Sequence, residues 1–278
     1  MQIGIFAKTF SAQGALPSLN AARAAGYAVV QFNLAVLGGA AMPEAIAPTA
    51  CAEIASASTR SGVAIAAVSG TYNMIHPDKA ARESGFARLA TLIRAAPQMG
   101  IRLVTLCTGT RHVSDQWAFH PDNASAAAWR ELLIEMERAA AIAEECGVDL
   151  GVEPELANVV SSAALGRRLI DELGSRRVKI VLDPANLFET APAAQIRSII
   201  AEAVDLLADR IVMAHAKDRR PDGGFATAGT GVIDFAHFVR TLRNAGFDGP
   251  LITHGLSEAE APDVAAYLHR AVAAGMAA

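Results

Sequence analysis

Apolar and polar residues follow one another along this chain in a pattern that predicts alternating strands and helices. Short apolar runs of strand length are separated by longer segments with apolar residues at i, i+3, i+4 and i+7. The clearest helical period runs from Trp129 to Ala143, and Gly147 is its expected stop. We expect strands at residues 3–6, 28–32, 63–68, 103–107, 150–153, 179–182, 211–215 and 251–254.

This pattern gives eight strand and helix units in one continuous chain. Strict alternation implies a parallel sheet, and about 30 residues per unit matches a closed (β/α)8 TIM barrel better than an open sheet. An open sheet would be expected to carry a glycine-rich phosphate turn after its first strand, and residues 7–11 contain no glycine. No change in composition marks a linker, so the sequence predicts an α/β fold with a single TIM barrel domain over residues 1–278.

Composition narrows the classes of partner. The hydrophobic fraction of 52% argues against disorder. The net charge of −4, with no basic cluster, disfavours a nucleic-acid partner, and no apolar run approaches the ~20 residues that span a membrane. Three widely spaced cysteines indicate reduced thiols. We therefore expect a cytoplasmic protein with a small, polar ligand; a homo-oligomer remains open.

Four of the expected strands end in side chains that can bind a metal. Asp183 closes an apolar run and precedes Pro184, which cannot donate to a sheet, while Glu153, His215 and His254 end three other strands. The residue two positions before each of them lies on the same face of its strand. These residues are Gly151 before Glu153, Val181 before Asp183, Met213 before His215 and Ile252 before His254. The carboxyl ends of barrel strands form the active face. Two carboxylates and two imidazoles converging there would be satisfied by one divalent cation, which predicts a metal site.

The motifs around these residues resemble the xylose isomerase-like TIM barrel superfamily, the sugar phosphate isomerase/epimerase family. The resemblance runs over the whole chain in order, and it rests on Gly151-Val152-Glu153-Pro154-Glu155, Val181-Leu182-Asp183-Pro184-Ala185-Asn186, His215-Ala216-Lys217-Asp218, Gly229-Thr230-Gly231-Val232-Ile233-Asp234 and Gly249-Pro250-Leu251-Ile252-Thr253-His254. It implies an enzyme of carbohydrate metabolism that isomerises or epimerises a sugar or keto-sugar, phosphorylated or not. The superfamily reaction abstracts a proton next to a carbonyl through a metal-stabilised enediolate.

The resemblance also implies a ligand set. Glu153, Asp183 and His215 match three of the four usual ligands of a divalent ion, and the fourth, commonly a glutamate, is His254 in this chain. Manganese is therefore expected first, with zinc, cobalt, iron or magnesium as alternatives. Because His254 stands where the superfamily usually has a second carboxylate, a lyase or dehydratase acting on a keto-sugar or keto-inositol is also left open. A non-catalytic sugar-binding barrel is a third alternative.

Further residues receive roles in this hypothesis. Glu153 or Glu155 would remove the carbon-bound proton, and His254 or Lys217 would return it. Lys217 follows His215 by two residues and should also point inward. Among substrate contacts we expect Asn186 and Glu155, with Lys8, Arg111 and His112 at other strand ends. The glycine-rich residues 219–231 are expected to form a mobile lid.

Overall fold

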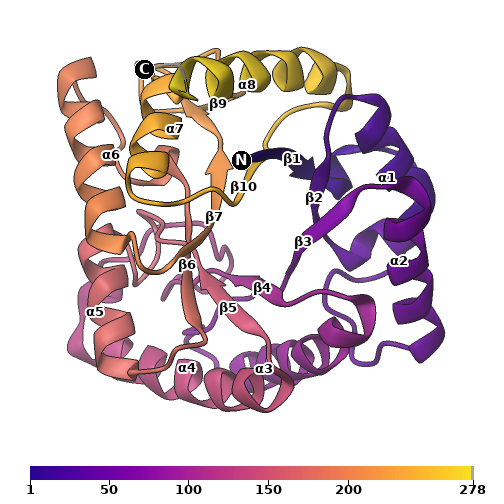
Figure 1. Ribbon diagram of the computed structural model, residues 1–278. Helices are drawn as coiled ribbons and strands as arrows, with labels where there is room; N and C mark the ends of the chain where they lie inside the picture. The colour runs from indigo at the N-terminus through magenta and orange to yellow at the C-terminus, as the bar shows by residue number, and fades with distance from the viewer. Residues whose placement is uncertain (277–278) are drawn as a thin grey trace.

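Eight parallel strands close into a barrel that is ringed by helices (Figure 1). The computed structural model describes residues 1–276. The barrel strands are β1 (Gln2–Phe6), β2 (Val29–Phe32), β3 (Ala64–Ser69), β4 (Leu103–Leu106), β5 (Asp149–Val152), β6 (Val178–Leu182), β7 (Ile211–Ala216) and β10 (Pro250–Thr253). Around the barrel their order is β1-β10-β7-β6-β5-β4-β3-β2. The predicted TIM barrel is confirmed, and each strand lies within a residue or two of its expected position.

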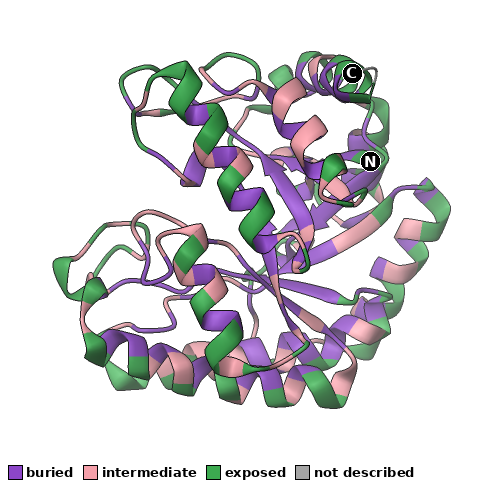
Figure 2. Ribbon diagram, turned by 60° about the vertical axis from the view of Figure 1, so that its left-hand side comes forward, coloured by how far each residue is buried: buried purple, intermediate pink, exposed green. Residues whose placement is uncertain are grey.

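A helix follows each barrel strand and packs one face against it. The α-helices are α1 (Ala15–Ala24), α2 (Pro48–Ser61), α3 (Lys79–Ala95), α4 (Ala126–Cys146), α5 (Ala163–Leu173), α6 (Ala193–Leu207), α7 (Phe235–Asn244) and α8 (Ala261–Met276). Short 3-10 segments are η1 (Ala7–Thr9), η2 (Leu34–Leu37), η3 (Ala96–Met99), η4 (Pro121–Ala124), η5 (Pro184–Asn186) and η6 (Glu258–Glu260). Figure 2 shows buried residues concentrated in the strands and exposed residues along the outer helix faces. This division is what the apolar stripes of the sequence require.

Side-chain caps explain where several helices begin. The Asp234 side chain accepts a hydrogen bond from the backbone N–H of His237 at the start of α7. Ser257 and Glu260 form a reciprocal capping box, which begins η6 and leads into α8. Gly147 ends α4 with a φ of 65°, a left-handed conformation that costs glycine little.

The barrel interior below the strand ends is filled by small and branched side chains. One buried cluster consists of Val29, Ala67, Leu103, Val181, Met213 and Ile252. Three of its members, Val181, Met213 and Ile252, were predicted to share a strand face with the metal-competent residues because side chains alternate along a strand. A Cβ added at Gly151 would lie 2.8 Å from Val181 Cγ2, so Gly151 leaves room for its neighbour. The four metal-competent side chains therefore stand above a packed floor.

One element was not predicted. Residues 219–231, expected to be a mobile lid, contain part of a small antiparallel hairpin, β8 (Asp218–Arg219) paired with β9 (Phe225–Ala226). The Asp218 carboxylate, fully buried, accepts backbone hydrogen bonds from Arg219, Gly229, Gly231 and Ile233 at 2.8–3.0 Å. Because one carboxylate satisfies four N–H groups, the loop has an internal anchor that glycine content alone does not reveal.

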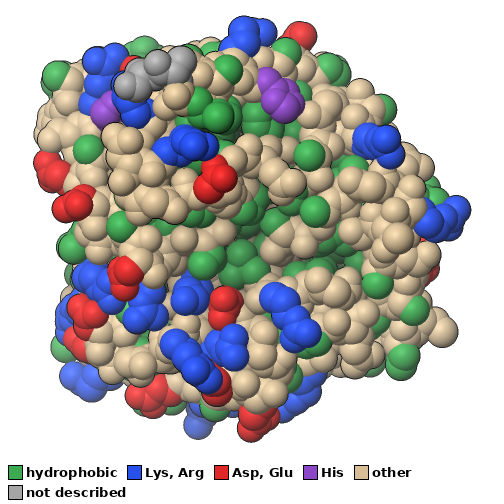
Figure 3. All heavy atoms as spheres, viewed as in Figure 1, with side chains coloured by type: hydrophobic (Ala, Val, Ile, Leu, Met, Phe, Trp, Pro, Cys, Tyr) green, Lys and Arg blue, Asp and Glu red, His purple; other side chains and the backbone are tan. Residues whose placement is uncertain are grey.

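The molecular surface pairs its charges. On the face seen in Figure 3, Lys and Arg side chains lie beside Asp and Glu, and hydrophobic side chains gather near the centre. Arg176 and Arg177, for example, both contact Glu144. Within residues 1–276, no helix has the length and hydropathy needed to cross a membrane.

Candidate metal centre

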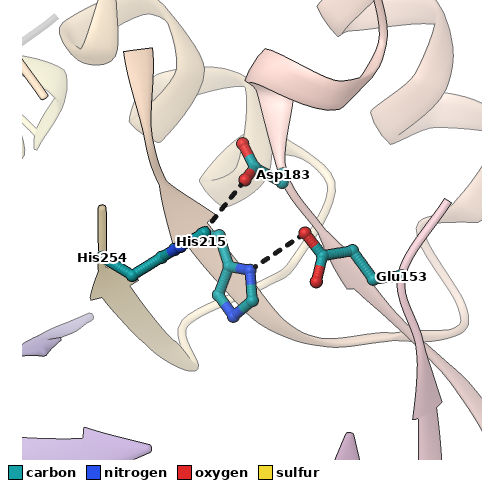
Figure 4. A group of neighbouring side chains, drawn as sticks. All are labelled: Glu153, Asp183, His215 and His254. Carbon is teal, nitrogen blue, oxygen red and sulfur yellow. Dashed lines mark hydrogen bonds and ion pairs between the residues drawn. The ribbon is translucent and has the colours of Figure 1, made fainter. Parts of the chain in front are cut away.

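Four side chains meet at the upper mouth of the barrel. Glu153, Asp183 and His254 come immediately after β5, β6 and β10, and His215 lies on β7. These strands are consecutive around the barrel, so the four side chains converge although they are far apart in sequence. One donor atom from each lies within 4.8 Å of the other three. Figure 4 shows the side chains pointing toward one another.

Asp183 lies at the centre of the group and is fully buried. Its Oδ1 accepts a hydrogen bond from the backbone N–H of Ala185 at 2.9 Å, in the turn that Pro184 begins. Its Oδ2 lies 3.3 Å from His254 Nε2 and 3.4 Å from Lys217 Nζ. Burial alone would raise the pKa of Asp183, but Lys217 and His254 outweigh it and hold that pKa well below its usual value. Asp183 is therefore an anion at neutral pH.

Glu153 is the second carboxylate of the group. Its Oε1 accepts a hydrogen bond from Asn186 Nδ2 at 2.8 Å and lies 3.2 Å from His215 Nδ1. Burial opposes ionisation, but the adjacent His215 lowers the pKa of Glu153 below its usual value. Glu155, two residues on, differs: burial and the charge of Glu153 raise its pKa to about 7. Two neighbouring carboxyl groups thus have their pKa values pushed apart.

His254 is held by an aromatic neighbour. Its ring stacks on Phe6, with centroids 4.6 Å apart and planes inclined by 16°. Burial lowers the pKa of His254, which favours the neutral imidazole that binds metals. Its Nε2 faces Asp183 Oδ2 in Figure 4, so the end of β10 offers a nitrogen donor to the same centre.

A buried glutamine orients His215, and the sequence interpretation missed it. Gln31 on β2 is 3% exposed, and its Oε1 lies 2.9 Å from His215 Nε2. Gln31 Nε2 donates to Ser69 Oγ at 2.9 Å and to Thr105 Oγ1 at 3.0 Å. With its amide nitrogen directed at two hydroxyls, Gln31 presents its oxygen to His215 and accepts a hydrogen bond from Nε2–H. The available signal was a single polar residue in the apolar strand 28–32.

The donor set fits a divalent cation. With its Nε2–H bonded to Gln31, His215 has Nδ1, on the side of Glu153, as the nitrogen that can bind a metal once it is deprotonated. Ligands on opposite sides of an ion with bonds of about 2.2 Å are about 4.4 Å apart, close to the 4.8 Å limit observed. The carboxylates of Asp183 and Glu153, whose pKa values are both lowered, repel each other, although Lys217 contacts Asp183. A cation would relieve this repulsion, and the mixed oxygen and nitrogen donors suit manganese, zinc, cobalt or iron.

A cavity of about 490 Å³ opens above these side chains. Its volume falls within the range of small-molecule sites. It is lined by Glu153 and His254 and by three other residues predicted for the site: Lys8, Glu155 and Lys217. Its remaining lining is mixed, with Gln31, Asn33, Ser69, Thr71, Thr105 and Gln116 as polar residues and Phe6, Ala41, Met42, Leu106, Trp117 and Phe225 as apolar ones.

Asn186 and Lys217 are held next to the carboxylates. Lys217 Nζ donates to Asn186 Oδ1 at 3.1 Å and contacts Asp183, as its inward parity predicted. Asn186 is 1% exposed and bridges Lys217 and Glu153. The Asn186 amide therefore fixes the positions of two neighbouring polar groups.

Arg111 and His112 are not brought to this cavity. Arg111 Nη1 donates to Glu131 Oε2 at 2.9 Å and to the Ile75 carbonyl at 3.1 Å. The His112 ring accepts a backbone hydrogen bond from Asp115 at 3.1 Å. Neither residue lines the cavity above the four donors. The loop after β4 directs Arg111 toward α4, where Glu131 neutralises its charge.

Solved structures share this fold at low sequence identity. The 3-keto-D-glucoside 4-epimerase from E. coli is 18% identical, with a TM-score of 0.75 over 97% of this chain and 99% of that chain. An L-ribulose 3-epimerase is 20% identical, with a TM-score of 0.75 over 99% and 96%. D-psicose 3-epimerase from Clostridium cellulolyticum H10, solved with D-tagatose, is 15% identical, with a TM-score of 0.72 over 98% and 99%.

Sequence comparison identifies the family. Among curated proteins no sequence matches this chain. The family model described as "Xylose isomerase-like TIM barrel" matches residues 19–271, which include all four metal-competent side chains. That match spans most of the chain and agrees with the barrel, the order of its strand ends and the predicted resemblance. The chain therefore belongs to the xylose isomerase-like TIM barrel family.

Proposed function

We propose that this protein is a divalent-metal-dependent isomerase or epimerase acting on a sugar or keto-sugar by proton abstraction next to a carbonyl. The observation that carries the proposal is the convergence of Glu153, Asp183, His215 and His254 below a cavity lined by further acid–base groups. The structural neighbours include epimerases of several sugars, which supports the class of reaction and leaves the sugar open.

Each of the four side chains has a part in holding the ion. Asp183 and Glu153 supply anionic oxygens, and His215 and His254 supply imidazole nitrogens. When bound, the ion supplies Lewis-acid chemistry, polarising a substrate carbonyl and an adjacent hydroxyl. We propose manganese as the native ion, with zinc, cobalt and iron as the nearest competitors for a donor set with two imidazoles.

Proton transfer falls to residues at the cavity wall. Glu153 Oε1 is engaged by Asn186 and His215, and Oε2 is the oxygen available to remove a carbon-bound proton. Lys217 lines the same cavity and is proposed to return a proton, with His254 as the other candidate. Glu155 also lines the cavity, and its pKa of about 7 lets it accept or donate a proton to a substrate hydroxyl near neutral pH. Lys8 is proposed to contact substrate at the rim.

A lyase or dehydratase is the second candidate, and one observation favours it. His254 occupies the position where the two-carboxylate epimerase mechanism needs a second base, and its Nε2 is directed at Asp183. A site that removes a proton on one side but lacks a carboxylate on the other suits elimination of water from a keto-sugar or keto-inositol. The paired Glu155 carboxyl could protonate the leaving hydroxyl.

We propose that the protein is cytoplasmic. Cys51, Cys107 and Cys146 are free thiols in the structure, which accords with the reducing cytoplasm. The proposed partner is a small sugar substrate.

Solvent exchange tests the proposal directly. Metal-loaded protein is incubated in deuterium oxide with D-fructose, D-psicose, D-tagatose, L-ribulose and keto-inositol, and proton NMR follows exchange and products. We expect deuterium at the carbon beside the carbonyl, with the rate falling at least 10³-fold in Glu153→Gln. Glu137→Gln, an exposed glutamate on α4, is the matched control and should exchange normally. Exchange with none of these substrates contradicts the proposal, and loss of water without proton return establishes the lyase instead.

A further inference from the structure

A second cavity adjoins the one above the metal centre. It has a volume of about 340 Å³ and is lined by Trp117, Phe119, Glu155, Leu156, Ala157, Glu189, Arg219 and Phe225. Trp117, Glu155 and Phe225 also line the first cavity, so the two share a boundary. A ligand seated over the metal centre therefore has an adjacent compartment into which it can extend.

The first cavity is already large for one sugar ring. A pyranose occupies roughly 180 Å³, about the volume of six water molecules. The first cavity alone measures about 490 Å³, and the second adds about 340 Å³. One ring would fill less than half of the first cavity, and a second linked ring could extend from the metal centre into the second compartment.

Aromatic side chains dominate the wall of the second cavity. Trp117, Phe119 and Phe225 are 50%, 65% and 45% exposed, and aromatic side chains are seldom left this open without a ligand or partner. Phe225 is fixed in place because Lys217 Nζ lies 3.9 Å and the Arg219 guanidinium 4.2 Å from its ring centroid. The hairpin β8–β9 thus places one aromatic ring between the two cavities.

A buried cation with a free donor adds the polar half of the site. Arg219 is 6% exposed; its Nε donates to the Ala185 carbonyl at 2.6 Å and its Nη1 to the Gly223 carbonyl. Its Nη2 donates to no residue in the range 1–276, although Arg219 lines the second cavity. Nη2 keeps access to solvent and is therefore free to donate to a ligand hydroxyl in the cavity.

The chemistry of the cavity selects among ligands. Glu155 and Glu189 share it with Arg219, so a phosphate would meet two carboxyl groups beside the one guanidinium. A sugar ring combines an apolar C–H face with a rim of hydroxyls. Aromatic rings match that face, while one guanidinium and two carboxyl groups match the rim.

We propose that the second cavity is a subsite for a second pyranose ring, so that the substrate is a glycoside of the keto-sugar and not the free monosaccharide. This inference rests on the proposed function for the identity of the first ring. The second ring stacks on Phe119 and Trp117 and accepts a hydrogen bond from Arg219 Nη2. Phe225 contacts both rings from the hairpin that Asp218 anchors.

Calorimetric binding tests the subsite without turnover. Metal-loaded protein is titrated with methyl β-D-glucoside, cellobiose, maltose and phenyl β-D-glucoside. We expect at least one disaccharide to bind tenfold or more tightly than the methyl glycoside. Phe119→Ala, which alters only the second cavity, should reduce that preference to threefold or less without weakening the methyl glycoside. Ile134→Ala removes an equally exposed apolar side chain from α4 and should leave the preference intact.

Three outcomes would overturn the inference. They are equal affinity for methyl glycoside and disaccharides, no binding of either disaccharide, and a preference that survives Phe119→Ala. Tighter binding of the phenyl glycoside than of both disaccharides would also overturn it, and would assign the cavity to an aromatic aglycone. The deuterium exchange of free ketoses is measured separately, so failure of the proposed reaction and failure of the subsite give different results.

Discussion

Gln31 gives the sharpest mutational test of how the barrel prepares a metal ligand. Its Oε1 accepts the Nε2–H of His215, which leaves Nδ1, directed at Glu153, as the nitrogen that can bind a metal. Gln31→Leu keeps the volume of the side chain and removes the acceptor. His215 can then carry its proton on either ring nitrogen. In the tautomer with the proton on Nε2, that N–H is buried without a hydrogen-bond partner.

The structure sets the size of the expected effect. Loss of a hydrogen-bond partner behind a metal-binding histidine typically weakens metal affinity by about 10–100-fold, which is about 1.4–2.7 kcal/mol. We expect Gln31→Leu at the upper half of this range because Gln31 is buried and held by both Ser69 and Thr105. Thr105→Val removes one of the two contacts that orient the amide, and it should cost threefold to tenfold.

Calorimetric titration of chelator-treated protein with Mn²⁺ measures this affinity. Gln31→Glu restores an acceptor for His215 Nε2 and should bind Mn²⁺ at least tenfold more tightly than Gln31→Leu. Thermal unfolding of the metal-free variants separates a local effect from loss of the fold. Equal affinities of Gln31→Leu and the wild type, within twofold, would refute the assigned amide orientation and tautomer.

Three other predictions concern stability. Asp218→Asn keeps one carbonyl oxygen for four backbone donors and should lower the free energy of unfolding by about 2–4 kcal/mol, measured with denaturant. Gly4→Ala places a Cβ 2.5 Å from the Val29 carbonyl oxygen and should cost at least about 1–3 kcal/mol, whereas Gly39→Ala meets nothing within 4 Å and should be neutral. Glu155 has a folded pKa of about 7, above its unfolded value, so the metal-free protein should lose stability as the pH rises from about 4.5 to 7, by at most about 3.4 kcal/mol. Glu155→Gln should remove this dependence of stability on pH. Stability that rises with pH over this range would contradict the prediction.

Much of the architecture followed from period and alternation. The helical stripe of α4 and the inward parity of Val181, Met213 and Ile252 are local properties of sequence, and the structure keeps them. Each interior residue is two positions before a metal-competent one, so the alternation of a strand is enough to place both. The glycine stop of α4 at Gly147 is equally local, and it was predicted from the sequence.

What the sequence could not supply was pairing across the barrel. Gln31 reaches His215 from a strand 184 positions away in sequence, and nothing in the residues around Gln31 names that partner. Asp218 similarly organises a hairpin through backbone N–H groups, which every residue type except proline has. Arg111 was predicted for the cavity by its place at a strand end, but a contact with Glu131 on α4 decides where its charge lies. Such contacts depend on how elements pack and not on local pattern.

The central claim is that Glu153, Asp183, His215 and His254 bind one divalent ion. The most direct measurement is a crystal structure of Mn²⁺-loaded protein with anomalous diffraction at the manganese edge. We predict one anomalous peak at the mouth of the barrel, with all four side chains at about 2.0–2.4 Å and His254 bound through Nε2. A peak coordinated by other residues, a peak that leaves His254 unbound, or no peak at this position would contradict the account.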